Sequence, residues 1–221
     1  MPTSPILTLE NVTFGYAGRP PLFKELSFEL HPHQQIGLYG PNGSGKTTLL
    51  RLIMGLETPQ SGRVLFHGLT TDDAQSLHRL RCGIGFVLQN SDDQLFSPTV
   101  LEDVAFGPLN LGLSRQAARE RAMETLESLG LETFADRATH RLSGGEKKMV
   151  SIASVLSMRP EALLLDEPTA FLDDDSRERI TGILKGQNIA RVVVSHDRCF
   201  LEQTACSCVC IKDGCMQPFS L

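Results

Sequence analysis

One glycine-rich run of eight residues constrains this 221-residue chain more than any other feature. It consists of Gly40, Pro41, Asn42, Gly43, Ser44, Gly45, Lys46 and Thr47. The run fits the pattern G-x-x-x-x-G-K-[S/T], follows a short apolar run at 35–39, and opens a helical pattern from Lys46 to about Met54. A strand, this loop and a helix in that order predict a phosphate-binding loop in an α/β protein with a largely parallel sheet.

The chemistry of this loop follows from its residue types. Glycines allow backbone N–H groups to turn inward around phosphate oxygens, and the helix N-terminus adds a positive partial charge. We expect Lys46 to reach the β- and γ-phosphates of a nucleotide and Thr47 to hold Mg²⁺ through its hydroxyl. The alternative is a glycine-rich turn that happens to precede a lysine. The strand and the helix on either side disfavour that alternative.

A second chemical feature lies about 120 residues further along the chain. The apolar run at 162–165 predicts a strand, and Asp166 and Glu167 follow it directly. Ligands bind at the carboxyl ends of strands in open α/β sheets, so Asp166 suits Mg²⁺ and Glu167 suits a base that polarises an attacking water. Alone, the pair could be an acidic turn after a buried strand. The phosphate loop upstream favours the catalytic interpretation.

The segment Leu142–Glu146 precedes a helix predicted at 146–156. Ser143 could simply cap this helix, with the two glycines as a turn. The functional interpretation is a second anion site at a helix N-terminus. Since the chain already carries one phosphate loop, a second anion site indicates a partner molecule.

The remaining pattern places β-rich segments on both sides of a helical insert at about 90–158. Strands are predicted at 6–9, 12–14, 26–30, 62–68, 192–194 and 207–211. Ser114 is expected to cap a helix that ends near Gly130, and the acidic run at 173–175 to cap another. The chain shows no internal repeat.

Composition excludes several function classes. The chain has 21 Lys plus Arg and 26 Asp plus Glu, and its net charge of −5 argues against extensive, sequence-independent binding of nucleic acid. Its apolar runs are far shorter than the roughly 18 residues of a membrane span, and its first residues lack the pattern of a secretory signal. Six cysteines, five of them within 199–215, indicate free thiols in a reducing cytosol.

The cysteines leave two alternatives open. Cys206, Cys208 and Cys210 alternate, so on a strand they would face one side. Thiolates on one face could bind a soft metal. Free cysteine also packs well as a small hydrophobic residue, and 208–214 resembles a strand with a hairpin turn. The second interpretation is favoured.

Taken in order, these segments resemble the nucleotide-binding subunit of ATP-binding-cassette (ABC) transporters, from about residue 5 to residue 215. The resemblance implies a P-loop NTPase of ABC type that hydrolyses ATP with Mg²⁺. It also implies an α/β fold with a mainly parallel sheet, an antiparallel β subdomain and a helical subdomain. The whole chain, 1–221, would be one domain, with the helical subdomain at about 90–158 inserted in a RecA-like core.

The resemblance also implies roles for individual residues. Nucleotide would be bound by Tyr16, Gly40, Pro41, Asn42, Gly43, Ser44, Gly45, Lys46, Thr47, Thr48, Gln89, Ser143, Gly144, Gly145 and Asp166. Catalysis would depend on Lys46, Glu167 and His196, and Mg²⁺ would be held by Thr47, Gln89 and Asp166.

Three of these residues have a plain alternative. Tyr16 would stack on adenine, but could be a core aromatic. Gln89 would sense Mg²⁺ or water and touch a membrane partner, but could be an ordinary loop amide. His196 would contact the γ-phosphate, but could simply end a strand. The sequence departs from the family pattern at Phe171, where many members have a small residue, and at Glu146, where glutamine is frequent.

Residues 89–112 look like the corresponding segment of ATPases from energy-coupling-factor importers, including the cobalt and nickel systems. This implies import of a metal ion or a vitamin, with the ATPase bound peripherally at the cytoplasmic face of the cell membrane. The partners would be a second ATPase subunit, a membrane scaffold and a substrate-binding membrane subunit. Many such ATPases have a further C-terminal domain, whereas this chain stops at Leu221, so it is expected to resemble the shorter members.

Within this segment, Leu95 and Phe96 are expected to contact the membrane scaffold, and Asp92 and Asp93 to face its basic groups. The alternative is that Leu95 and Phe96 are core residues. For the whole chain, two other functions stay open. It could be the ATPase of a conventional ABC transporter, or a soluble ABC-type ATPase acting on nucleic acid or ribosomes. The chain lacks the coiled coils, zinc insertions and basic arm typical of that soluble class.

Overall fold

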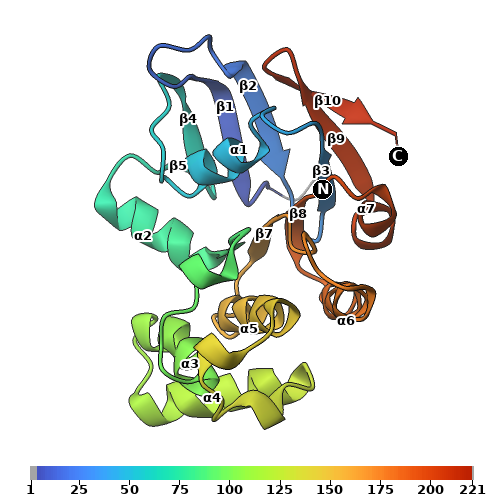
Figure 1. Ribbon diagram of the computed structural model, residues 1–221. Helices are drawn as coiled ribbons and strands as arrows, with labels where there is room; N and C mark the ends of the chain where they lie inside the picture. Colours follow the sequence, from blue (N-terminus) through green and yellow to red (C-terminus); the bar gives the residue numbers. More distant parts are fainter. Residues whose placement is uncertain (1–3, 221) are drawn as a thin grey trace.

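The structure, a computed structural model, describes residues 4–220 and contains two β-sheets in this range (Figure 1). The larger sheet has the strand order β10 (Cys215–Phe219), β9 (Ser207–Lys212), β3 (Gln35–Tyr39), β8 (Ala190–Val194), β7 (Ala162–Asp166) and β6 (Ile84–Val87). Its strands are parallel except β10, which pairs antiparallel with β9. The smaller sheet is antiparallel, in the order β2 (Phe23–Leu30), β1 (Leu7–Phe14), β4 (Ser61–Phe66) and β5 (Leu69–Thr70).

The central strands of the larger sheet are buried on both faces. Every residue of β7 and β8 is buried, which explains why these segments are continuous apolar runs rather than alternating ones. In the pairing register, Val194 of β8 lies opposite both Leu38 of β3 and Asp166 of β7. The segments that follow β3, β7 and β8 therefore begin at the same edge of the sheet.

Helix α1 (Lys46–Ile53) lies between the two sheets. Its buried residues Leu49, Leu50 and Ile53 share one hydrophobic cluster with residues of β1 and β2 and with Leu38 and Val194 of the larger sheet. This packing anchors the helix on both sides. The loop before α1 is thus held between a strand end and a fixed helix start.

Three helices form a separate group on the far side of the larger sheet from the smaller one (Figure 1). They are α3 (Val100–Asn110), α4 (Arg115–Ser128) and α5 (Gly144–Leu156). Their apolar faces join a second hydrophobic cluster that includes Leu163 and Leu165 of β7 and Val193 of β8. Of the three, α5 lies beside the sheet and joins the group to it.

The remaining helices are α2 (Ala74–Gly83), α6 (Asp174–Lys185) and α7 (Arg198–Thr204). The expected caps Ser114 and Asp173 are confirmed: each side chain accepts a hydrogen bond from the third backbone N–H of its helix. Helix α5 begins at Gly144, two residues earlier than predicted, because Ser143 caps it. Helix α2 was not expected, since it is polar and buries only Ser76 and Leu80.

The cysteine-rich end forms the expected strand and hairpin. Strand β9 begins at Ser207, so Cys206 precedes it, and Gly214 makes the turn to β10 with φ of 81°. Within residues 4–220, no group of three or more His, Cys, Asp or Glu side chains could hold a metal ion. The thiol of Cys208 packs over Gly37 of β3, as a small hydrophobic side chain would.

Candidate functional site

The loop from Gly40 to Thr47 joins β3 to α1 in a conformation that requires glycine. Gly45 precedes the first helical residue with φ of 100°, in the left-handed region. A Cβ atom there would lie 2.9 Å from the side chains of Leu22 and Phe23. The loop therefore passes close to the core and leads directly into the N-terminus of α1, where helix N–H groups favour an anion.

Lys46 lies under this loop rather than in solvent. It is 7% exposed, and its Nζ donates hydrogen bonds to the carbonyl oxygens of Gly40 (2.7 Å) and Pro41 (3.0 Å). Burial lowers the pKa of the Lys46 ammonium, and the nearby carboxylates of Glu167 and Asp166 partly oppose this shift. The ammonium thus lies between the loop and the two acids, where it can pair with an anion.

Asp166 is the last residue of β7 and is 2% exposed. Burial raises the pKa of this carboxyl group, and a hydrogen bond with Thr47 lowers it in part. Its Oδ1 atom is buried and has no hydrogen-bond partner among the residues that the structure describes. This unpartnered carboxylate oxygen at a strand end can accept a cation, since most buried polar atoms in folded proteins have a partner.

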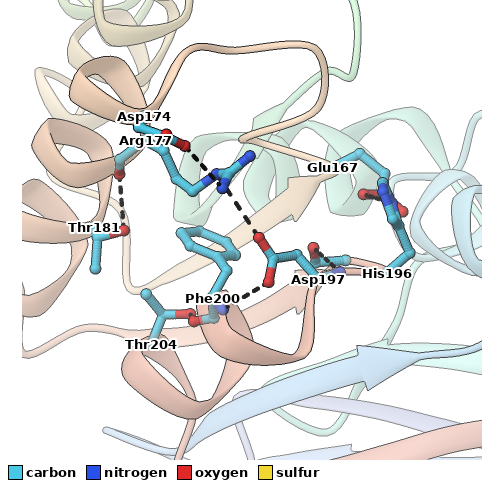
Figure 2. A network of polar contacts seen from close by, with 9 residues as sticks. Glu167, Asp174, Arg177, Thr181, His196, Asp197, Phe200 and Thr204 are labelled. Carbon is cyan, nitrogen blue, oxygen red and sulfur yellow. Dashed lines mark hydrogen bonds and ion pairs between the residues drawn. The ribbon is translucent and has the colours of Figure 1, made fainter.

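Glu167 follows with φ of 44°, an uncommon backbone conformation for a residue with a side chain. Its Oε2 lies 2.9 Å from Nδ1 of His196, and Figure 2 shows the two side chains facing each other. The Glu167 side chain is 10% exposed and that of His196 is 66% exposed. The pair therefore joins the end of β7 to the segment after β8, with the imidazole open to solvent.

The loop that carries His196 is tied to helix α6 (Figure 2). Asp197 accepts a hydrogen bond from the backbone N–H of Phe200 at the start of α7. Its other carboxylate oxygen lies 3.7 Å from Nε of Arg177, which also pairs with Asp174 at 3.3 Å. These contacts connect the segment that carries His196 to α6.

The strand ends and the loop enclose a cleft of about 550 Å³. Every predicted loop residue from Gly40 to Thr48 except Ser44 lines it, and so do Gln89, Asp166, Glu167 and His196. Ser44 points into the loop, and its hydroxyl is buried without a partner among residues 4–220. Most of the predicted site residues, from four separate parts of the chain, are therefore brought together.

Besides Ser44, four predicted residues lie outside the lining of this cleft. Tyr16 is 41% exposed, and its hydroxyl lies 3.2 Å from that of Thr48, so it sits at the side of the loop. Ser143, Gly144 and Gly145 form the N-terminus of α5. Ser143 and Glu146 make a reciprocal capping box, and Ser143 and Gly144 are exposed. This second N-terminus is therefore open to a molecule outside the chain.

Two residues near the site had no assigned role in the sequence. Lys148 of α5 is 3% exposed, and burial lowers the pKa of its ammonium to about 8. The only available signal was its place as the second of two adjacent lysines, directly before the apolar part of a helix pattern. Phe171, noted as a departure, lines the cleft while its side chain is 99% exposed, with φ of 62°.

The model of a protein family described as ABC transporter matches residues 23–170. The chain belongs to the ABC transporter ATP-binding family. It is 46% identical over 198 residues to the cobalt import ATP-binding protein CbiO of Rhodobacter capsulatus, covering 88% of this chain and 71% of that protein. It is 53% identical over 212 residues to a provisionally named ABC transporter ATP-binding protein of Nitratidesulfovibrio vulgaris, covering 96% of this chain and 78% of that protein.

Comparison with solved structures points to the same family. The chain matches cbiO1 of Clostridium perfringens, described as part of the transporter complex cbiONQ, with a TM-score of 0.84 and 33% identity over 97% of this chain and 87% of that one. It also matches a dimeric ATP-binding cassette in a post-hydrolysis state bound to ADP and phosphate. The TM-score is 0.84 and the identity 30%, and the match covers 97% of this chain and 99% of that one. The expected family and fold class are confirmed.

This ABC ATPase binds and hydrolyses ATP, as its family and the post-hydrolysis cassette indicate. It is the ATP-binding subunit of an ABC transporter. Across residues 4–220, we find no helix of the length and apolar character that crossing a bilayer requires.

Proposed function

We propose that this ATPase powers an energy-coupling-factor type importer of a metal ion, such as cobalt or nickel, or of a vitamin. The observation that carries the proposal is an exposed aromatic pair within residues 89–112. Phe96 is 66% exposed and Phe106 is 44% exposed, with ring centroids 4.7 Å apart in an edge-to-face arrangement. Exposed aromatic side chains in contact are typical of a protein interaction surface. The similarity to the cobalt import protein supports an importer.

The structure of this segment favours docking through Phe96. Asp103 is 4% exposed, and its Oδ1 accepts hydrogen bonds from the N–H groups of Phe96 and Ser97, which hold the turn in place. Leu95 packs partly against the core, so it contributes less to a docking surface than expected. Asp92 already pairs with Lys147 at 2.6 Å, which leaves Asp93 as the freer charge for a basic partner.

Replacing Phe96 by Ser should weaken assembly with the membrane scaffold by about 2 kcal/mol, or roughly thirtyfold, because an interface aromatic is often a hot spot. The paired change of Asp92 and Asp93 to Ala should weaken it less. Co-purification with the scaffold and substrate uptake measure the loss of assembly, while soluble ATPase activity should survive.

Leu69→Ser is the matched control, since Leu69 is 56% exposed and lies outside the segment 89–112. Unchanged uptake and assembly in the Phe96 variant would place the docking surface elsewhere.

Mg²⁺ is proposed as the metal that accompanies ATP in the cleft. The unpartnered Oδ1 of Asp166 and the hydroxyl of Thr47 are oxygen ligands of the kind that Mg²⁺ prefers, and Gln89 lines the same cleft. The residues present therefore fit the ion. When bound, Mg²⁺ neutralises charge on the phosphate oxygens. Asp166 and Thr47 would hold it, and Lys46 would pair with the phosphates from the loop side.

Hydrolysis is proposed to depend on Glu167 as the general base. Its carboxylate follows Asp166 directly, faces the cleft, and contacts His196, which can orient it. Tyr16 would pack against the adenine from the side of the loop, since its ring is partly exposed beside Thr48.

Two copies are proposed to enclose two ATP molecules, each between the loop 40–48 of one copy and residues Ser143–Gly145 of the other. The separation of these two N-termini within one chain supports this, because the second is exposed and lies outside the cleft. Two-fold symmetry would make both sites form together. A related cassette could replace one copy.

Light scattering tests this arrangement. The Glu167→Gln protein should shift from monomer to dimer when ATP is added, because it would bind ATP without hydrolysing it quickly. Ser143→Arg in the same background should prevent the shift, since the larger side chain would fill the exposed N-terminus of α5. A monomer in every nucleotide state, with or without the membrane partner, would contradict the arrangement.

A further inference from the structure

Lys148 is a buried cation whose partners are backbone atoms. The ammonium donates hydrogen bonds of 2.7 Å to the carbonyl oxygens of both Leu88 and Gln89. Within residues 4–220 it makes no ion pair, although Asp166 lies near enough to favour its charged form. A buried ammonium is costly unless its donors are satisfied, so this contact with two carbonyl groups is a specific one.

The two carbonyl groups belong to the segment where the chain leaves the sheet. Strand β6 ends at Val87, which is the last residue paired with β7. Beyond it, Leu88 donates its N–H to Oε1 of Gln94, and Nε2 of Gln94 donates to the carbonyl oxygen of Ser151 in α5. The segment 88–94 is therefore held on α5 by Lys148 at one end and by Gln94 at the other.

The same helix carries the exposed N-terminus at Ser143, and the same segment carries Gln89, which lines the nucleotide cleft. An ammonium has three donors on a compact head, so one lysine can hold two successive carbonyl groups, which a neutral methionine of similar length cannot. Lys148 therefore joins α5 to the backbone of Gln89 through a contact of hydrogen-bond length.

We propose that Lys148 is a positioning residue of the ATP site: it fixes the backbone of Gln89 to α5, so that Gln89 and the Ser143 end of α5 move as one unit. This rests on the proposed role of Gln89 at Mg²⁺ or the attacking water. Lys148 does not touch the nucleotide itself. It makes the place of Gln89 in the cleft depend on the position of the helix that would contact the second ATP site.

The test compares Lys148→Met, Gln89→Ala and the double variant with wild type, using the complete chain. Lys148→Met should lower kcat about tenfold or more, with KM for ATP within about twofold, because a displaced group affects the reaction more than binding. The Mg²⁺ concentration for half-maximal binding of a fluorescent ATP analogue should rise in both single variants. The double variant should be no slower than the slower single variant, because Lys148 acts through Gln89.

Lys147→Met is the matched control. Lys147 is the neighbouring lysine, but its partner Asp92 is 67% exposed, so this ion pair contributes little. The control should retain the wild-type kcat and Mg²⁺ response. Additive losses in the double variant, or a Lys148→Met protein that matches wild type while Gln89→Ala is impaired, would overturn the positioning role. If Gln89→Ala itself matches wild type, the proposed role of Gln89 is wrong and the positioning role is wrong with it.

Hydrogen exchange of the wild-type protein keeps the proposal testable if Lys148→Met does not fold. Amides that open together exchange with one common free energy. The protected amides of Leu88 and Leu95 should therefore exchange at rates within about tenfold of those in the first half of α5. Exchange of these two amides that is faster by several orders of magnitude would show that the segment opens without α5, and would overturn the proposal.

Discussion

Glu167→Gln is expected to bind ATP as wild type does and to hydrolyse it roughly a hundredfold more slowly, or slower still, the scale of a lost general base. The amide has nearly the same shape as the carboxylate and can still contact His196, whose Nδ1 lies 2.9 Å from Glu167. It cannot accept a proton from water at neutral pH. Steady-state phosphate release measures turnover, and binding of a fluorescent ATP analogue measures affinity.

The chain provides a matched control for this change. Glu161 also pairs with a histidine, His67, at 2.8 Å, but both side chains are about half exposed and neither lines the cleft. Glu161→Gln should therefore hydrolyse ATP at the wild-type rate. A Glu167→Gln protein with unchanged turnover would show that the base is another group.

Lys46→Ala should instead lose affinity for ATP by roughly ten- to a hundredfold, since a hydrogen bond to a charged group contributes about 1.5–3 kcal/mol. The ammonium lies beneath the loop, bonded to Gly40 and Pro41, within reach of a phosphate group in the cleft. Equilibrium binding measures the loss, and activity at saturating ATP separates it from a loss of turnover.

A thermal unfolding measurement and a control variant show whether a loss of affinity in Lys46→Ala comes from the lost contact or from a damaged fold. Thermal unfolding checks the fold, because Lys46 is buried and its removal leaves two carbonyl groups with one partner fewer. Lys185→Ala is the control, since Lys185 is exposed on α6 and bonds only to Gln203 among the described residues. Wild-type ATP affinity in a folded Lys46→Ala protein would contradict the assigned role.

The sequence predicted those parts of the site that depend on backbone geometry over a few residues. The loop before α1 needs glycine at Gly45 because of its positive φ and its close approach to the core, and this requirement is visible in the pattern itself. The acidic pair after β7 is equally local, because an apolar run predicts a buried strand and its end places Asp166 and Glu167 at one edge.

Other parts could not be predicted, because their partners lie far along the chain. Asp92 was expected to face a partner protein, but its carboxylate pairs with Lys147, 55 residues away. Helix α2 was missed for a different reason: it is polar and buries only Ser76 and Leu80, so it lacks the apolar periodicity that predicts a helix, although Asp73 caps it locally.

The sequence by itself determined the family, through the order of its motifs. It also determined the glycine-rich loop, the acidic strand end and the caps of α4 and α6, because short-range stereochemistry and hydrogen bonding specify each of these. The tertiary structure decided which side chains meet across the sheet edge, such as Glu167 and His196, and what a buried charge is bonded to. In the sequence, Lys148 is not distinguishable from other helical lysines. Only the packing shows that it contacts Leu88 and Gln89, about 60 residues earlier. The physical reason is that burial and the pairing of charges depend on how distant segments pack, whereas turns and helix starts depend on neighbouring residues.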